Sequence, residues 1–288
     1  MNRAFFHGLK VVAQQKAEAL LLDLFPGAAA AFSLRKLRAG YTGAAIRVRR
    51  SSDDAEQDIG FDANGDLDTA SLLAFVGSGD GFVVTIYDQS PNNNHLIPAL
   101  GDVLIVQNGS LVVENGKPAL FFPLNGILES LNPYPTTSFQ HHFYVASSTD
   151  SNSDRNRVLD TRGLGSLGAN PGWFSAFNVN QNASFRDNGI DAIGTQNVFR
   201  SGQNLASVFI EDLFISEYTN SVLINQNVST ISGSFNSGSK LYVGGLRDAP
   251  DTNQAFTGTM QEIICFNIDK KPQRQDIEAN INNYYNVF

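Results

Sequence analysis

The chain has 288 residues, of which 42% are hydrophobic and 17% are charged, and its formal net charge is −8. This acidic balance excludes a typical nucleic-acid binder, because a negative surface repels a polyanion, and no stretch approaches ~20 uninterrupted apolar residues, which excludes a membrane-spanning helix. An all-β chain of this length can bury one continuous core as a single main domain.

The first 25 residues predict an amphipathic helix, because apolar side chains recur near a 3.6-residue period until Pro26 and Gly27 interrupt them. We expect residues 1–27 to form a helical attachment segment and residues 28–288 to form the main domain. The helix either docks on the surface of that domain or contacts another subunit. The segment lacks the apolar run of a secretory signal peptide, so export by that route is not expected. The expected contact residues are Phe5, Phe6, Leu9, Leu20, Leu21 and Leu24.

The remainder of the chain is rich in short strand-like runs. Residues 28–37 fit either a helix or a first strand, and residues 67–77 fit a brief helix or turn. Gly, Asn or Pro separates most of the later β-rich runs, which is typical of an antiparallel sandwich. The end of the chain, residues 256–267 followed by 274–288, resembles the closing strand and terminal helix of lectin-like sandwiches, which implies a helix that packs back through Ile277, Ile281, Tyr284 and Tyr285. The expected strands lie at 45–50, 82–88, 103–107, 110–114, 118–122, 141–147, 157–161, 173–179, 207–218, 221–228, 240–246 and 262–268.

Two blocks in the first third of the chain carry a family resemblance. They are the turn Gly40-Tyr41-Thr42-Gly43, with a basic strand after it, and the block Tyr87-Asp88-Gln89-Ser90. They resemble the N-terminal concanavalin-like (LamG-like) domain of B-type α-L-arabinofuranosidases, and they are also similar to lectin-like structural proteins of bacteriophages. The resemblance implies an all-β, concanavalin A-like (jelly-roll) antiparallel β-sandwich, here with an N-terminal helix and a C-terminal helix.

The resemblance also implies where a hydrolase would carry its carboxylates. A retaining glycosidase needs two carboxyl groups about 5–5.5 Å apart. The counterpart of the family's nucleophile segment is residues 158–161, but the expected Glu falls at Gly165, and no Asp or Glu occurs between Thr161 and Arg186. Residues 186–189 loosely match the segment of the family's acid but are typical of a hairpin turn. Pairing of Asp160 with Asp187 or Glu211 stays open, and we expect a protein that is not an enzyme.

Polar and aromatic residues form a second set of candidates, for sugar binding. In a sandwich loop Asp88 either accepts hydrogen bonds from sugar hydroxyls or caps loop amides, while His95 anchors the next strand. Trp173, the only tryptophan, either stacks on a sugar ring or fills the core. The candidate carbohydrate-binding residues are Tyr87, Asp88, Asn94, His95, Asp160, Arg162 and Trp173.

Metal and disulfide chemistry have little support in the sequence. Residues 62–68 and 150–154 alternate oxygen-bearing side chains but lack the Gly and Glu that complete a calcium loop, so we expect polar turns and no cofactor, with calcium as the alternative. The pair His141-His142 lacks Cys and points to opposite faces if extended, so no metal site is expected. Cys265, the only cysteine, lies in an apolar run and is expected to be buried without a disulfide, which suits a reducing cytoplasm.

These observations lead to a functional hypothesis with two alternatives. We expect a non-enzymatic phage virion protein, tail-associated or capsid-decorating, that is made in the host cytoplasm. Its expected partners are other virion proteins and further copies of itself as a homo-oligomer, with surface polysaccharide as a potential ligand. The alternatives are a divergent glycoside hydrolase of arabinofuranosidase type and a stand-alone carbohydrate-binding module.

Overall fold

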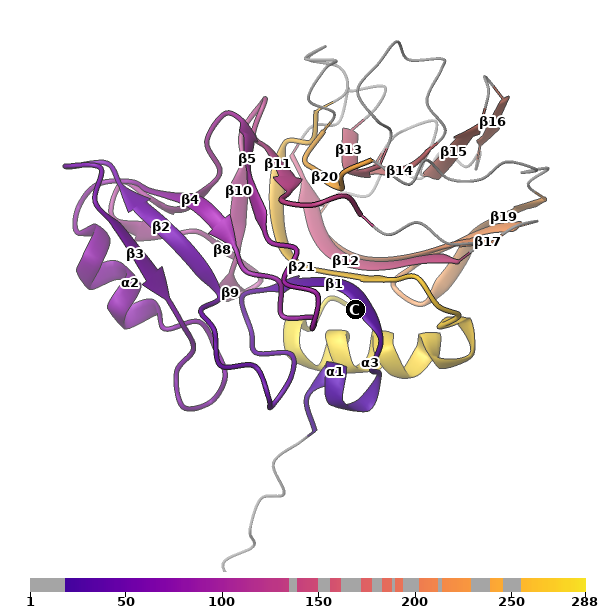
Figure 1. Cartoon of the computed structure of the whole chain (residues 1–288), viewed down its shortest axis with the longest axis horizontal. Helices are drawn as coiled ribbons and strands as arrows, with labels where there is room; N and C mark the ends of the chain where they lie inside the picture. The colour runs from indigo at the N-terminus through magenta and orange to yellow at the C-terminus, as the bar shows by residue number, and fades with distance from the viewer. Residues whose placement is uncertain are drawn as a thin grey trace, which may run out of the picture.

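The computed structural model describes most of the chain. The described residues are 19–134, 139–149, 156–161, 172–177, 183–187, 190–193, 202–211, 214–228, 239–245 and 255–288. Within these ranges the chain forms two packed layers of antiparallel strands with short helices at the periphery (Figure 1). The expected all-β antiparallel sandwich is therefore confirmed. No helix in the described ranges is long and apolar enough to cross a lipid bilayer.

The first layer is a curved sheet built around the longest strands. Its order follows from the pairings β1–β21, β21–β12, β12–β17, β17–β18 and β18–β19, and β10 continues the sheet beside β21. Every residue of β12 is buried. Tyr144 and Ala146 point to one face of the sheet and Phe143 and Val145 to the other, and each pair packs in a different hydrophobic cluster. The strands are β1 (Ala28–Ser33), β10 (Leu120–Phe122), β12 (Gln140–Ser148), β17 (Gly202–Glu211), β18 (Phe214–Thr219), β19 (Val222–Val228) and β21 (Gly258–Phe266).

The second layer runs in the order β3–β2–β4–β5–β11–β20–β13–β14–β15–β16. The strand β6 (Leu104–Gln107) pairs with both β4 and β10 and so connects the two layers. Short β7 (Ser110–Leu111) pairs with β6, while β8 (Val113–Glu114) and β9 (Lys117–Pro118) form a small hairpin. The second-layer strands are β2 (Ile46–Arg50), β3 (Glu56–Ile59), β4 (Gly81–Ile86), β5 (Leu96–Leu100), β11 (Ile127–Ser130), β13 (Asn156–Asp160), β14 (Gly172–Phe177), β15 (Ala183–Asp187), β16 (Ile190–Ile193) and β20 (Tyr242–Val243).

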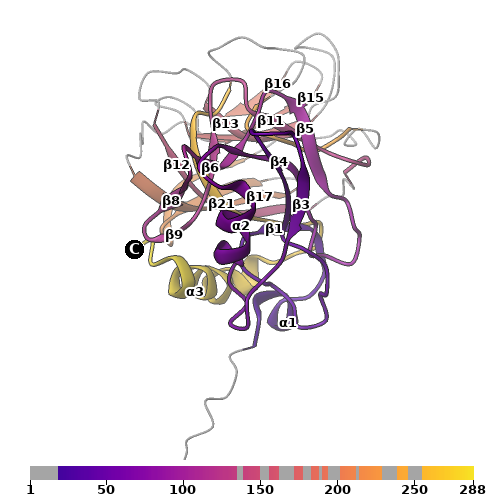
Figure 2. The same ribbon diagram turned by 90° about the vertical axis from the view of Figure 1, so that its left-hand side faces the viewer.

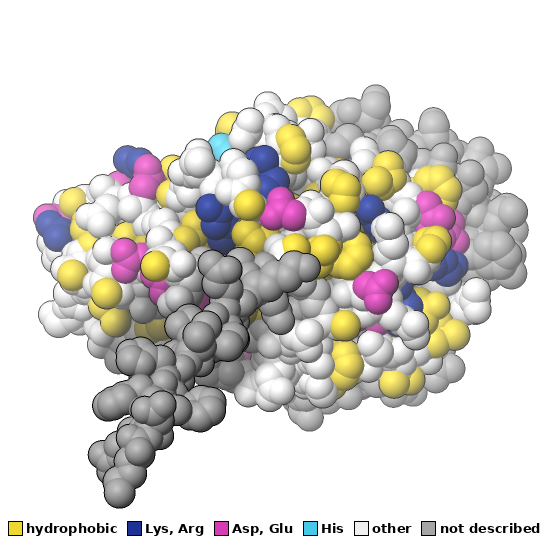
Figure 3. Space-filling view, turned by 90° about the horizontal axis from the view of Figure 1, so that it is seen from below, with side chains coloured by type: hydrophobic (Ala, Val, Ile, Leu, Met, Phe, Trp, Pro, Cys, Tyr) yellow, Lys and Arg dark blue, Asp and Glu magenta, His cyan; other side chains and the backbone are white. Residues whose placement is uncertain are grey.

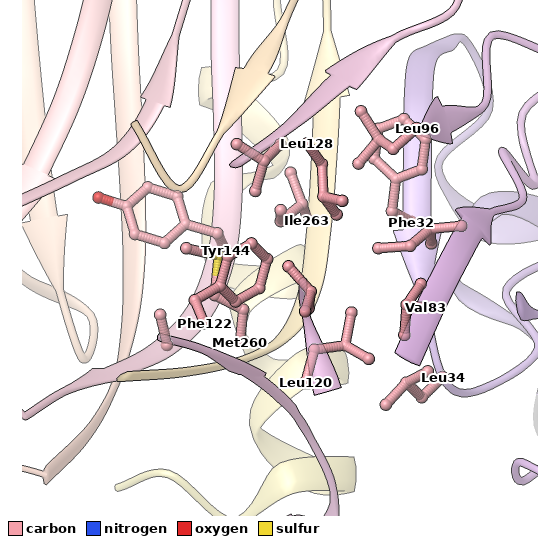
Figure 4. Packing of buried hydrophobic residues seen from close by; sticks show 14 of the residues in the cluster. Phe32, Leu34, Val83, Leu96, Leu120, Phe122, Leu128, Tyr144, Met260 and Ile263 are labelled. Atoms are coloured by element: carbon pink, nitrogen blue, oxygen red, sulfur yellow. The ribbon is translucent and has the colours of Figure 1, made fainter. Parts of the chain in front are cut away.

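The main hydrophobic core lies between the two layers. It draws side chains from the first third of the chain and from the last strand, so distant parts of the sequence hold each other in place (Figure 4). Cys265 is fully buried here, as expected. Burying one large apolar side chain contributes about 1.5–3 kcal/mol. The residues labelled in Figure 4 are Phe32, Leu34, Val83, Leu96, Leu120, Phe122, Leu128, Tyr144, Met260 and Ile263.

A second core lies on the other face of the first layer, beneath helix α3 (Arg274–Tyr285), which follows the 3₁₀ turn η1 (Lys271–Gln273) (Figure 2). Ile277 and Ile281 pack there against Phe143 and Val145 of β12. The predicted terminal helix is confirmed. Helix α2 (Thr69–Val76) is confirmed as well and begins at Asp68, whose carboxylate accepts a hydrogen bond from Ser71 N.

The N-terminal helix differs from its prediction. Within residues 19–27 only α1 (Leu21–Leu24) is helical, and Leu20 has an extended backbone, so one continuous helix through residue 25 is wrong. Leu21 packs beneath α3, whereas the Leu24 side chain is exposed. The other expected contact residues, Phe5, Phe6 and Leu9, lie outside the described residues. Residues 28–33 form a strand and not a helix, because β1 hydrogen-bonds along β21 from Phe266 to Glu262.

Candidate functional site

The loop after β4 is organised by the buried carboxylate of Asp88. Its Oδ1 accepts hydrogen bonds from Ala31 N at 2.9 Å and Ser90 N at 2.8 Å. Its Oδ2 accepts from Ser90 Oγ at 2.7 Å and from Asn94 N at 2.9 Å. The bond from Ala31 joins the loop to β1, and the other three lie within the loop. Together they use the acceptor capacity of the carboxylate within the protein. Asp88 therefore caps loop amides, which is the second of the two roles considered for it from the sequence.

The neighbours of Asp88 also have protein partners. His95 Nδ1 accepts a hydrogen bond from Asp88 N at 3.0 Å, and burial lowers the pKa of His95. Tyr87 donates its hydroxyl to Asp58 Oδ1 at 2.8 Å and packs edge-on against His95. The Asn94 amide binds the backbone of Asn132. Sugar binding by Tyr87, Asn94 and His95 stays a prediction.

The other expected sugar-binding residues lie on or near β13 and β14. Asp160 and Arg157 are fully buried, and Arg157 Nη1 donates to Asp160 Oδ2 at 3.2 Å. A β-bulge between Arg157 and Leu159 gives β13 the extra residue that lets these side chains meet. Trp173 pairs with Phe185 through the backbone of β14, and Arg162 lies outside the described residues.

Strand register places Asp160 in a row with a second carboxylate. Asp160 pairs with Tyr242 of β20, and Tyr242 pairs with Glu129 of β11. Directly paired residues of antiparallel strands share one face of a sheet. The side chains of Glu129, Tyr242 and Asp160 therefore form one line across three strands, which we call the polar row. Its outer carboxylates are about 10 Å apart at Cα, two interstrand spacings.

The polar row lies on the side of the second layer that faces away from the main core. Its neighbours in register, Leu128, Val243 and Leu159, belong to the main core, so the alternate residues point outward. Tyr242 belongs instead to a separate small cluster with Ile127. Lys240 Nζ donates to Glu129 Oε1 at 2.9 Å. Each carboxylate of the row is thus balanced by a cation, Lys240 at one end and Arg157 at the other.

The two alternative carboxylate pairs do not converge. Asp187 lies two strands from β13 and three residues past the partner row of Asp160, which places the Cα atoms about 14 Å apart. Asp187 pairs with Ile190 as a hairpin requires. Glu211 is the last residue of β17 in the other layer and accepts from Lys271 Nζ at 3.0 Å. Glu129 was not among the residues predicted from the sequence. The feature that could have identified it is that it is the one acidic residue in the short apolar run after Gly126.

The interior face of the first layer carries further buried polar groups. His142 pairs with Val208, which pairs with Glu217, and all three side chains are fully buried. Burial holds the pKa of His142 well below its ordinary value, so the ring is neutral. His141 points to the opposite face, as the strand pattern predicted, and packs against Phe209. Because His142 and Glu217 project into the main core, they lie apart from the polar row.

One cluster has the composition of a metal site. Potential ligand atoms of His141, Glu211 and Asp269 lie within 4.8 Å of one another. His141 Nδ1, however, accepts a hydrogen bond from Lys270 N at 2.9 Å, so the neutral ring carries its proton on Nε2. A metal at Nε2 would require removal of that proton as well. This arrangement fits a hydrogen-bonded anchor for the segment before α3 better than a metal ligand.

The carboxylates of residues 62–68, for which calcium was the alternative to a polar turn, bind groups of the protein itself. Asp62 Oδ1 accepts from Asn64 N at 2.8 Å and from Asp66 N at 3.0 Å. Asp66 accepts from the hydroxyl of Tyr284, while Asp68 caps α2. These carboxylates therefore serve a turn, a tyrosine and a helix end. The second loop, residues 150–154, lies outside the described residues.

Comparisons with known proteins relate the chain to arabinofuranosidases. Residues 24–116 match the family model of the catalytic domain of α-L-arabinofuranosidase B. Over 75 residues the chain is 39% identical to a probable α-L-arabinofuranosidase B of Aspergillus flavus, a stretch that covers 26% of this chain and 15% of that protein.

Solved structures extend the likeness to nearly the whole chain. A GH54 α-L-arabinofuranosidase soaked with a cyclic sulfate inhibitor has a TM-score of 0.67 at 16% identity, and covers 91% of this chain and 64% of its own. An arabinofuranosidase complexed with arabinofuranosyl-α-1,2-xylobiose has a TM-score of 0.66 at 15% identity, with the same coverages. The chain thus spans less than two thirds of these relatives. The likeness shows the concanavalin-like fold of these enzymes.

These findings correct the functional hypothesis from the sequence. The hypothesis of a non-enzymatic phage protein in the tail or on the capsid is wrong, because the family model, the curated relative and the two solved structures described above are those of arabinofuranosidases. The expectation of a virion location is wrong for the same reason. The hypothesis was based on the absence of Glu at position 165. That absence concerns one expected position only, and it says nothing about the carboxylates that the fold brings together.

Proposed function

We propose that this chain is a glycoside hydrolase of the α-L-arabinofuranosidase type and that the polar row is its reaction centre. The observation that carries the proposal is the placement of Glu129 and Asp160 on one face, two strands apart, in a sandwich similar to arabinofuranosidases. From Cα atoms about 10 Å apart, two carboxyl groups can reach the separation of a retaining glycosidase, about 5–5.5 Å, or of an inverting one, about 6.5–9.5 Å.

Each member of the row has a task in this chemistry. In glycoside hydrolysis one carboxylic acid protonates the leaving oxygen, while the other group attacks the sugar or activates water. Asp160, with Arg157 beside it, suits the role that requires a carboxylate. Glu129 is then assigned the role of proton donor, which requires the bound substrate to displace Lys240 from its carboxylate. Tyr242 sits between them with its ring against Ile127 and fixes their spacing.

Solvent access supports approach from the Glu129 end. The Asp160 and Arg157 side chains are fully buried, whereas the Lys240 side chain is 31% exposed and ion-paired to Glu129. A sugar that enters beside Lys240 meets Glu129 first. The substrate itself is proposed from the relatives, one of which was solved with an arabinofuranosyl-xylobiose.

The proposal is tested by hydrolysis of 4-nitrophenyl α-L-arabinofuranoside. We expect turnover by the unaltered chain and a loss of about 10²–10⁴-fold in kcat for Glu129→Gln and Asp160→Asn. Glu211→Gln, which changes a carboxylate of the other layer, is the matched control and should keep its rate. Thermal unfolding of each variant checks that it is folded. Binding of arabinosides without turnover by the unaltered chain, or full activity in folded Glu129→Gln, would contradict the proposal.

A further inference from the structure

A groove of about 730 Å³ lies on the opposite side of the molecule from the polar row. It is bounded by α1, by the turn at residues 62–66 and by the exposed side of α3. The first layer separates it from β13 and β20 (Figure 1). The face that carries α1 and α3 presents mixed polar, charged and apolar side chains, with no block of a single charge (Figure 3).

The side chains at the floor of the groove have partners within the protein. Arg35 donates to both oxygens of the buried Glu262, at 2.7 and 2.9 Å, so its charge is compensated. The ring of Tyr284 has Arg35 at 4.8 Å and Lys117 at 4.0 Å from its centroid. Burial and the bond to Asp66 raise the pKa of Tyr284, which keeps the hydroxyl a donor. Two cations thus already lie against this ring, which disfavours the stacking of a sugar on it.

The walls retain unused hydrogen-bonding groups. Asn280 lines the groove, but its Oδ1 is buried and does not reach a ligand there. Asn283 and Lys36 also line the groove, and their side chains bond to no other residue in the part of the chain that the structure describes. Asp23 accepts from Ala39 N through Oδ2, which leaves Oδ1 available. The groove thus offers both donors and acceptors, and several hydroxyl groups require both.

The charges of the groove narrow the class of ligand. Asp23, Asp62 and Asp66 oppose a single uncompensated cation, Lys36, so a phosphate or sulfate is repelled. A bound cation is disfavoured, because Asp62 and Asp66 already accept hydrogen bonds from the turn and from Tyr284. An uncharged, hydroxyl-rich chain fits both constraints.

We propose that this groove binds a neutral glycan chain and holds the polysaccharide while the polar row acts on another part of it. The choice of an arabinose-containing glycan rests on the proposed function, whereas the preference for a neutral polyhydroxyl ligand rests on the groove itself. The site supplies hydrogen bonds from Asn283, Lys36 and Asp23 and no stacking platform. Affinity for one chain segment is therefore modest and grows with the number of hydroxyl groups engaged.

The test is affinity electrophoresis of the full chain through gels that contain soluble arabinoxylan or linear arabinan. We expect retardation of the unaltered chain, and at least tenfold weaker binding for the double variant Lys36→Ala/Asn283→Ala. Gln275→Ala, an exposed residue of α3 outside the groove, is the matched control and should bind as the unaltered chain does. The rate on 4-nitrophenyl α-L-arabinofuranoside, which is too small to span both sites, should not change in the double variant.

The outcomes separate this inference from the proposed function. Equal retardation of the double variant and the unaltered chain overturns the groove, whatever the hydrolysis assay gives. Retardation that is lost only in Asp160→Asn also overturns the inference, because the glycan then binds at the polar row. Retardation that is seen only after deletion of residues 1–18 overturns it as well, because the N-terminal segment of the chain then occupies the groove. Retardation that depends on Lys36 and Asn283 without any turnover supports the groove and contradicts the hydrolase.

Discussion

Arg157 and Asp160 form an ion pair of 3.2 Å within one strand although both side chains are fully buried. Two buried charges in contact neutralise each other, but either one alone would be costly in the interior. The pair therefore fixes one end of the polar row and makes β13 dependent on it. Replacement of one partner tests stability separately from catalysis.

Arg157→Met should destabilise the fold by about 3–5 kcal/mol, because it leaves the Asp160 carboxylate buried without its cation. Urea unfolding of the single variants and of Arg157→Met/Asp160→Leu measures this effect. The double variant should lose less than the sum of the single losses. Strict additivity would contradict the coupling that we infer from the 3.2 Å contact.

Asp88→Ala should lower the free energy of unfolding by roughly 3 kcal/mol, since the buried N–H groups of Ala31, Ser90 and Asn94 lose their acceptor. Gln107→Ala, an exposed polar residue of β6, is the control and should stay within about 0.5 kcal/mol. Chemical denaturation gives both values. An Asp88→Ala protein as stable as the control would mean that the loop does not depend on this carboxylate.

Stability should decrease as the pH falls from about 6.5 to about 4, because burial lowers the pKa of His141 from 6.5 to about 4. In that window the unfolded chain binds a proton that the folded chain excludes, so the stabilisation is complete above pH ~6.5 and is lost towards pH ~4. The depressed pKa of His142 acts in the same direction. His141 alone accounts for up to roughly 3 kcal/mol.

The variant His141→Gln isolates this contribution. Its unfolding free energy, measured by denaturation from pH 7 to pH 4, should fall less steeply than that of the unaltered chain. The remaining slope belongs to His142 and the carboxyl groups. Identical slopes in the two proteins would show that burial does not hold His141 neutral in the folded protein.

Gly258→Ala should destabilise the protein by several kcal/mol, about 3 by analogy with other strained backbone sites. Gly258 has a φ of +151°, and a Cβ there would overlap the carbonyl oxygen of Ser147. Gly60→Ala is the matched control, because no atom lies within 4 Å of its added Cβ. A thermal melt distinguishes them, and equal melting temperatures would contradict the close approach of β12 and β21.

Local sequence patterns predicted the elements whose burial is one-sided. In β2, Ile46 and Val48 are buried while Arg47 forms ion pairs with Glu56 and Asp58. The alternation of aliphatic and basic residues in the sequence therefore identifies the buried and the exposed face of this strand. Helix α3 was expected from the resemblance of the end of the chain to the terminal helix of lectin-like sandwiches.

The polar row could not be predicted in the same way. Glu129, Tyr242 and Asp160 are brought together by the register of three strands that lie far apart in the chain. No local spacing encodes that register, and β11 itself was not expected. The prediction of one N-terminal helix was wrong although its local pattern was clear. The apolar period runs past Leu20, but the backbone of Leu20 is extended and only Leu21–Leu24 are helical within residues 19–27.

The measurement that tests the polar row most directly is the rate of Glu129→Ala and Asp160→Ala on 4-nitrophenyl α-L-arabinofuranoside with and without added azide. Azide can replace a missing attacking carboxylate only where a cavity opens at the reacting sugar carbon. We predict that both variants lose activity and that azide restores turnover of Asp160→Ala with an arabinosyl azide product. Folded variants that keep the full rate, or a folded, inactive Asp160→Ala that azide does not restore, would contradict the assignment of these carboxylates.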